Sequence, residues 1–208
     1  YTGNLLQYWV PDTEARLADD VYAALSEATP DGLRVLDQSE ASDQDSYTVT
    51  RATADQYGLA EIGDLAKLAP PVKIGANSEF ATRPYGIPGL RDVYGVEGVV
   101  VPIEDSGSAL TVKALVDGDV QVADIYTASP AIQLNNLVSL ADPKALILPQ
   151  NIVPIASDAV DERAAGIINA VSAKLGMADL IAMNTRSVNE QLSSSQIATD
   201  WLREKGLL

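Results

Sequence analysis

Aromatic, charged and amide side chains recur at the ends of predicted strands and helices in this sequence. They are Tyr1, Asp45, Tyr47, Arg83, Asp124, Tyr126 and Gln150. The face of a tyrosine ring attracts a cation, and an arginine guanidinium holds a carboxylate through two parallel hydrogen bonds. Open α/β sheets bind ligands beyond the carboxyl ends of their strands. These residue types at these positions therefore predict a small-molecule binding site.

The composition removes most catalytic chemistry. The 208 residues include no Cys and no His, which excludes thiolate nucleophiles, disulfides, Cys/His zinc sites and the usual histidine base. A G-x-S-x-G nucleophile motif is also absent. We therefore expect a protein that is not an enzyme and that uses no cofactor and no metal.

The net charge of −15 disfavours phosphate backbones and anionic membrane surfaces. We therefore expect no nucleic-acid partner. The same negative charge does not repel cationic or zwitterionic ligands. No stretch reaches the roughly 18 consecutive apolar residues that a membrane span needs.

The elements that must position these side chains follow an α/β pattern. Helical spacing of Leu17, Val21 and Leu25 predicts a helix within 14–28, and Tyr8 and Trp9 have the spacing of core residues. Another helix is expected over 108–118, with Leu110 on its buried face. The predicted strands are 33–36, 72–76, 98–104, 120–126 and 137–140. Strands that alternate with short helices indicate βαβ units and a mostly parallel sheet.

The alternation is confined to the middle of the chain, which suggests two lobes. Residues 48–148 form an inserted α/β lobe in this interpretation. Residues 1–47 and the helical segment 149–208 cannot each bury their apolar faces alone, so they are expected to make up the other lobe together. Two crossings, near 46–49 and 147–151, would form a hinge beside a ligand-binding cleft.

Five motifs along the chain carry a family resemblance. In order they are YTGNLL (1–6), DSYTVTRATA (45–54), SEFATRPYGIPGLRDVYGV (78–96), GDVQVADIYTASPAI (118–132) and LPQNIVPI (148–155). Together they resemble the substrate-binding proteins of osmoprotectant ABC importers, the glycine betaine, choline and carnitine binders of the OpuC/ProX type. The resemblance covers essentially the whole chain and implies a two-lobe fold like that of type II periplasmic binding proteins.

The resemblance implies roles for the aromatic and cationic residues. Tyr1, Tyr47 and Tyr126 would form walls of an inter-lobe aromatic cage around a quaternary ammonium group. Such a group has no N–H to donate, so ring faces hold it instead, at about 0.5–2 kcal/mol per ring. Arg83 would hold a ligand carboxylate, a task that lysine performs less well.

Further positions are similar to the family pattern or depart from it. By resemblance, Asn4 would hydrogen-bond a ligand oxygen and Asp45 would add negative potential. Gln150 stands where many relatives carry an aromatic residue, and Tyr85 stands where they often carry an aspartate. One wall of the cage is thus either more polar than in those relatives, or Tyr85 supplies the missing aromatic ring. Carnitine or a choline derivative is therefore as acceptable a ligand as glycine betaine.

The resemblance also implies a cellular role and a longer chain. It implies an extracytoplasmic protein, periplasmic or lipid-anchored at the outer face of the membrane, that delivers a compatible solute to a membrane permease. The family's first strands would precede residue 1, so the first lobe would be incomplete and the chain could self-associate through an exposed sheet edge. Two alternatives remain, an enzyme on the same scaffold and the ligand-sensing domain of a regulator.

Overall fold

The computed structural model describes all residues from Tyr1 to Leu208, and the chain divides into two compact units. Unit 1 comprises Tyr1–Gln44 together with Leu148–Leu208, and unit 2 is the continuous stretch Asp45–Ile147. The chain thus changes unit at 44/45 and at 147/148. The first change comes slightly before the predicted crossing at 46–49, and the second lies within the predicted 147–151. Each unit has its own hydrophobic clusters.

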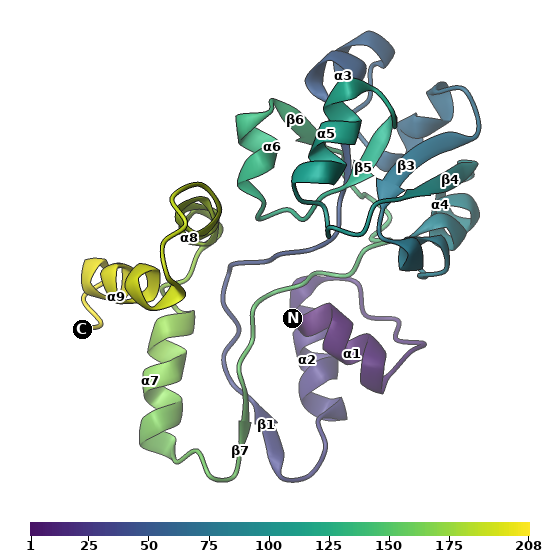
Figure 1. Ribbon diagram of the computed structural model, residues 1–208. Coiled ribbons are helices and arrows are strands. Elements are labelled where there is room, and N and C mark those ends of the chain that lie inside the picture. The colour runs from purple at the N-terminus through teal and green to yellow at the C-terminus, as the bar shows by residue number, and fades with distance from the viewer. The chain divides into compact units, whose positions relative to one another are not determined.

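Unit 2 is built on a five-stranded sheet in the order β4-β3-β5-β2-β6 (Figure 1). The strands are β2 (Tyr47–Thr50), β3 (Val72–Ala76), β4 (Gly98–Pro102), β5 (Val122–Asp124) and β6 (Leu137–Ser139). β3 pairs in parallel with β4 and β5, as the alternation predicts. β2 pairs antiparallel with both β5 and β6, so the sheet is mixed rather than mostly parallel. β2 differs because the chain enters the unit at Asp45, beside the carboxyl end of β5, and must run away from that edge.

Helices cover both faces of this sheet. They are α3 (Arg51–Tyr57), η1 (Ile62–Lys67), η2 (Ser78–Ala81), α4 (Ile87–Tyr94), α5 (Ala109–Asp117) and α6 (Pro130–Leu134). Val122 packs in the cluster that contains η1 and α4, whereas its neighbour Ala123 packs in the cluster that contains α5. Successive side chains of a strand point to opposite faces, so neither face of β5 is left to solvent.

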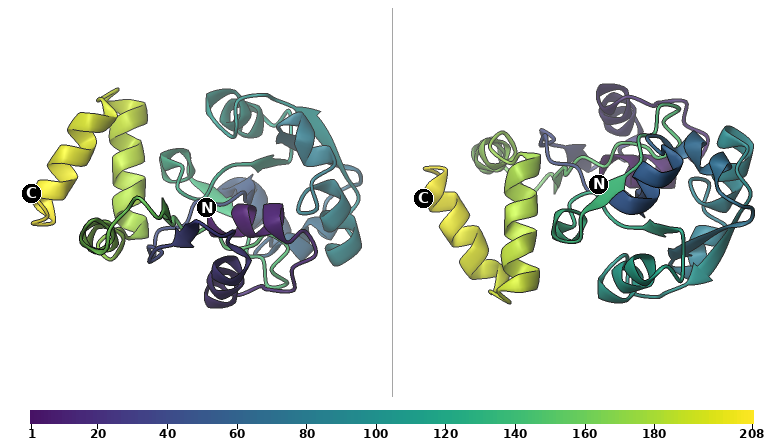
Figure 2. Two further views of the ribbon diagram at one scale, coloured as in Figure 1. Left: turned by 90° about the horizontal axis from the view of Figure 1, so that it is seen from below. Right: turned by 90° about the horizontal axis from the view of Figure 1, so that it is seen from above.

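Unit 1 consists of a two-stranded antiparallel ribbon and five helices (Figures 1 and 2). The elements are α1 (Thr2–Trp9), α2 (Ala18–Ala28), β1 (Leu33–Val35), β7 (Ile155–Ser157), α7 (Glu162–Ser172), α8 (Met177–Asn189) and α9 (Ser194–Glu204). α1 and α2 pack on each other through Leu6, Val21 and Leu25, which are fully buried. A second small cluster joins Leu36 and Ala156 to Ala165 of α7.

Three predictions from helical spacing are wrong. Leu17 is 69% exposed and precedes α2 as its N-cap residue. Tyr8 is 79% exposed and Leu110 is 64% exposed, although both were expected in a core. Tyr8 and Leu110 each lie on a helix that buries only one narrow face, through Leu6 in α1 and through Val112 and Leu115 in α5. The spacing of apolar residues identifies the helix, but the neighbouring element decides which of these residues are buried.

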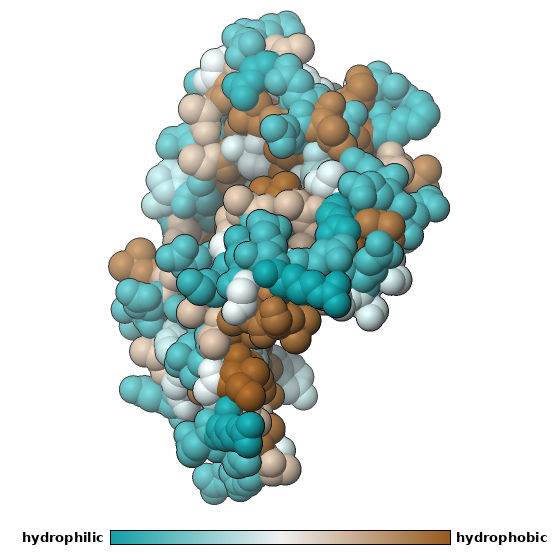
Figure 3. All heavy atoms as spheres, turned by 90° about the vertical axis from the view of Figure 1, so that its left-hand side faces the viewer, coloured by the Kyte–Doolittle hydropathy of each residue, from teal (hydrophilic) through white to brown (hydrophobic).

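The surface mixes polar and apolar residues. On the face shown in Figure 3, hydrophobic atoms lie among largely hydrophilic ones. No single helix is long and apolar enough to span a membrane. α7 and α8 satisfy length and composition only as a pair, and that pair is bent by 85°.

Candidate functional site

Two carboxyl groups of unit 2 meet where β5 ends. Asp124 is the last residue of β5 and lies opposite Tyr47 in the antiparallel register with β2. The backbone N–H of Ile125 donates to the carbonyl oxygen of Ser46 at 3.2 Å, which continues this pairing toward Asp45. The carboxyl groups of Asp45 and Asp124 are hydrogen-bonded to each other. Ionised carboxylates only accept hydrogen bonds, so one member of the pair carries a proton.

Burial determines which carboxyl group holds that proton. Asp124 is 8% exposed, and desolvation raises its pKa well above the usual range, with the charge of Asp45 raising it further. Burial also raises the pKa of Asp45, but hydrogen bonds from Asp124 and Tyr85 and the charge of Arg83 oppose that rise. The proton therefore lies on Asp124, and Asp45 is the ionised acceptor.

A glycine turn closes over the end of β5. Gly107 has a φ of 71°, and a Cβ there would lie 2.7 Å from the carbonyl oxygen of Asp124. Only glycine combines this left-handed backbone with such a close approach. The carboxylate of Asp105 fixes the same turn by accepting from the N–H of Leu110 at 2.7 Å. This packing keeps water away from Asp124.

The loop after η2 brings Arg83 and Tyr85 to the carboxyl pair. The phenol of Tyr85 is hydrogen-bonded to Asp45, and burial followed by the charge of Asp45 raises its pKa. The side chain of Arg83 is 52% exposed, and its nearest ion-pair partner, Glu79, lies 3.7 Å away. Such an exposed and long ion pair is worth little, so the guanidinium can exchange it for another carboxylate.

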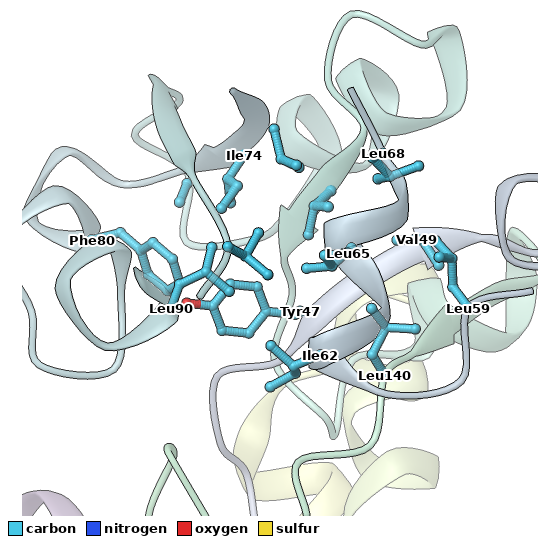
Figure 4. Packing of buried hydrophobic residues seen from close by; sticks show 14 of the residues in the cluster. Tyr47, Val49, Leu59, Ile62, Leu65, Leu68, Ile74, Phe80, Leu90 and Leu140 are labelled. Carbon is cyan, nitrogen blue, oxygen red and sulfur yellow. The ribbon is translucent and has the colours of Figure 1, made fainter. Parts of the chain in front are cut away.

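Tyr47 lies in the hydrophobic core and not in a wall of a binding site (Figure 4). Its side chain is 1% exposed, and its ring packs edge-on against Phe80 with the ring centroids 5.5 Å apart. Its one hydroxyl proton is shared between the carbonyl oxygens of Tyr85 at 2.8 Å and Gly86 at 3.1 Å. The expectation that Tyr47 presents its face to a ligand is therefore corrected. Tyr47 instead anchors the backbone of the loop that carries Arg83.

Replacement of Tyr47 by phenylalanine is expected to lower the free energy of unfolding by about 1–3 kcal/mol, because the carbonyl group of Tyr85 loses this donor. The carbonyl group of Gly86 keeps its hydrogen bond from the N–H of Leu90. Urea denaturation followed by far-UV circular dichroism measures this loss. Hydrogen exchange should also become faster at the backbone N–H groups of Gly86 and Leu90, which close the loop. Tyr57→Phe, at a residue 43% exposed in α3, is the matched control and should change stability by less than about 0.5 kcal/mol. Unchanged stability in Tyr47→Phe would contradict the anchoring role.

Tyr126 follows β5 by two residues and joins the same group of side chains. It is half-buried, and it is close enough to Tyr85 for its charge to raise the pKa of Tyr85. Its carbonyl oxygen accepts from the N–H of Ser129 at 2.9 Å, which fixes the backbone ahead of α6. The structure thus brings together three of the predicted residues, Asp45, Arg83 and Tyr126. We refer to Asp45, Asp124, Arg83, Tyr85 and Tyr126 as the unit 2 cluster.

The remaining predicted residues lie together in unit 1. The amide group of Gln150 accepts from the backbone N–H of Asn4 at 2.9 Å and donates to the Asn4 side chain at 3.1 Å. Gln150 is 3% exposed, whereas Tyr1 is 51% exposed and donates to Asp43 at 3.3 Å. Gln150 therefore holds the first turn of α1 in place, and Tyr1 presents part of its ring to solvent.

Sequence reasoning gave Asp124 no role, although it noted the residue at a strand end. A signal was present, because an aspartate within the apolar run VQVADIY must be buried with its strand. Strongly acidic side chains are seldom fully buried unless they are paired, and buried ones often mark functional sites. Its partner Asp45 lies 79 positions earlier in the numbering, so only the folded chain reveals the pair.

Comparison with known proteins gives the family. Residues 1–204 match OpuAC, the substrate-binding domain of ABC-type glycine betaine transport systems. The glycine betaine-binding protein YehZ of Escherichia coli (strain K12) is 21% identical over 221 residues, covering 99% of this chain and 72% of YehZ. A glycine-betaine-binding protein of Pseudomonas aeruginosa is 26% identical over 167 residues, covering 74% of this chain and 54% of the relative.

The fold agrees with this family. A crystal structure of a glycine betaine/carnitine/choline ABC transporter superposes with a TM-score of 0.84 at 20% identity, covering 100% of this chain and 77% of that one. The α/β architecture is that of a type II periplasmic binding protein, as the motifs predicted. The match over residues 1–204 shows that the chain belongs to the OpuAC family of substrate-binding domains of ABC-type glycine betaine transport systems.

Proposed function

We propose that this protein is the extracytoplasmic solute-binding component of an ABC importer and that it captures a quaternary ammonium compatible solute. Glycine betaine, carnitine and choline are the candidate solutes. The observation that carries the proposal is the unit 2 cluster, in which the buried Asp124 and the partly buried Asp45 are grouped with two tyrosines and an arginine. The cluster offers a negative charge for the cationic end of a zwitterion and a positive charge for its carboxylate.

The acidic part of the cluster suits a methylated cation. A quaternary ammonium group cannot donate a hydrogen bond, so its recognition depends on ring faces and on nearby negative charge. Tyr85 and Tyr126 supply rings, and the ionised Asp45 supplies the charge. The hydroxyl of Tyr85 is tied to Asp45, which fixes the ring while it contacts a ligand.

The cationic part of the cluster suits a carboxylate. Arg83 has only a long contact with Glu79, so its planar guanidinium can form two parallel hydrogen bonds with a ligand carboxylate. Glycine betaine and carnitine carry such a group, whereas choline does not. The cluster thus predicts that solutes with both charges bind more tightly than choline.

The family description supports a transport role. Its members are binding components of glycine betaine transport systems, and the relatives named above bind glycine betaine. We propose that the chain delivers its solute to a membrane permease and that it is lipid-anchored or periplasmic. Tyr1, Asn4 and Gln150 remain proposed ligand contacts of unit 1.

Isothermal titration calorimetry with glycine betaine, carnitine, choline and proline tests the proposed function. We expect saturable binding of the three quaternary solutes and binding of proline that is weaker by about tenfold or more, because proline lacks the methylated cation that two rings stabilise. Equal affinity for proline and the quaternary solutes would contradict ring-based recognition. No binding heat with any of the four would overturn the proposed function.

A further inference from the structure

We infer that binding of a cationic solute at the unit 2 cluster expels the proton shared by Asp45 and Asp124, so that Asp124 becomes a second negative charge facing the solute. This inference rests on the proposed function, because it concerns the same cluster. It goes further in giving Asp124 a role in recognition and in making solute capture depend on pH.

The first observation is an unsatisfied oxygen. Asp124 is more than nine-tenths buried, and its Oδ1 has no hydrogen-bond partner in the protein. Its other contacts are the hydrogen bond with Asp45 and one that involves the backbone of Ser46. A buried acceptor without a donor costs about 1–3 kcal/mol, so the site is incomplete without a group that stabilises this oxygen.

The second observation is the balance of charge. The guanidinium of Arg83 acts on Asp45 and forms a long ion pair with Glu79. Asp124 lies near the negative charges of Asp45 and Glu79. Ionisation of Asp124 would place a further negative charge beside Asp45, and the cluster has no second cation to offset it. The proton on Asp124 supplies that missing positive charge in the solute-free protein. A bound ammonium group would supply it instead.

Other ionisable groups near the pair do not take over this role. They lie on several segments and are Tyr47 in β2, Glu79 in η2, Arg83 and Tyr85 in the loop after η2, Asp105 in the turn that covers Asp124, and Tyr126 after β5. Burial raises the pKa of Tyr47 and of Tyr85, so both stay neutral. Asp105 is engaged in capping α5. Asp124 is therefore the group whose protonation a cation should change.

The direction of the pH effect follows from linkage. Without solute, burial holds the pKa of Asp124 well above its usual range. A cation nearby favours the ionised form and lowers that pKa, so binding releases a proton at pH values between the two. Affinity for the solute should therefore rise with pH across this window, by at most about tenfold per pH unit, and level off above it.

Calorimetry in two buffers measures the release directly. Choline is titrated into the protein at one pH in phosphate, which has a small heat of ionisation, and in Tris, which has a large one. We expect the two observed enthalpies to differ, because the protons that the protein releases are taken up by buffers with different heats of ionisation. We also expect the dissociation constant to fall as the pH is raised, because a higher pH favours the ionised form of Asp124. Identical enthalpies in both buffers together with a flat pH profile would overturn the proton coupling. Loss of all binding would instead overturn the proposed function.

The variant Asp124→Asn tests whether Asp124 is the group that releases the proton when the solute binds. Asparagine keeps a donor toward Asp45 and mimics the protonated acid, so this variant should release no proton and should bind at every pH with the low-pH affinity of the wild type. Asp117→Asn, at an exposed residue paired with Lys113, is the control and should keep the wild-type buffer dependence. Asp45→Asn provides a second variant, which removes the acceptor of the shared proton and should reduce the release. Wild-type buffer dependence in both Asp124→Asn and Asp45→Asn would overturn the assignment to this pair.

Discussion

Tyr126→Ala is expected to weaken binding of every quaternary ammonium solute by about 30-fold. This factor corresponds to the roughly 2 kcal/mol that a ring contributes to a desolvated cation. Tyr126 lies near Tyr85 and follows the buried Asp124 by two residues. Its backbone is fixed by the hydrogen bond to Ser129, so alanine removes the ring without freeing the loop. Calorimetry with glycine betaine and with choline should show similar losses, because the ring contacts the part that these solutes share.

The control for this variant is Tyr57→Ala. Tyr57 is a partly exposed tyrosine of unit 2 that lies in α3, outside the cluster, and its loss should leave affinity unchanged. Tyr126→Phe should retain most of the wild-type affinity, since the ring face and not the hydroxyl makes the contact. Equal affinity of Tyr126→Ala and wild type for all solutes would show that the ring does not contact the ligand.

Arg83→Ala is expected to weaken binding of the solutes that carry a carboxylate and to spare choline. Binding of glycine betaine and carnitine should weaken by about 10- to 100-fold, since hydrogen bonds to a charged group are worth about 1.5–3 kcal/mol. Choline has no carboxylate, so its affinity should change by less than about twofold or improve slightly when a nearby positive charge is removed. Parallel titrations of the three solutes measure the difference.

Two further variants make this result specific. Arg83→Lys should recover only part of the loss, because an ammonium group cannot form the two parallel bonds of a guanidinium. Arg91→Ala provides a control, since Arg91 is similarly exposed at 57% and pairs with its neighbour Asp92 on α4. A uniform loss for all three solutes in Arg83→Ala would indicate that the arginine supports the loop and does not bind the carboxylate.

Much of the fold could be predicted from local pattern. The strand expected over 72–76 is β3, and the apolar runs expected over 98–104, 120–126 and 137–140 contain β4, β5 and β6. These runs are bounded by turn residues, so sequence identifies them well. Their ends were less predictable, since β5 spans only Val122–Asp124 within the predicted 120–126. The antiparallel direction of β2 depends on where the chain enters the unit, which no local pattern contains.

The sequence by itself determined the family, through five ordered motifs, and it supplied the arginine, the tyrosines and the aspartate of the site. Only the tertiary structure decided what each side chain does. Tyr47 and Tyr126 are alike in sequence context, yet Tyr47 is covered by η1 and α4 while Tyr126 remains half-buried. The proton on Asp124 likewise comes from its burial and from the charge of Asp45. Burial and charge proximity are properties of neighbours brought together by folding, and residue type and spacing alone do not specify them.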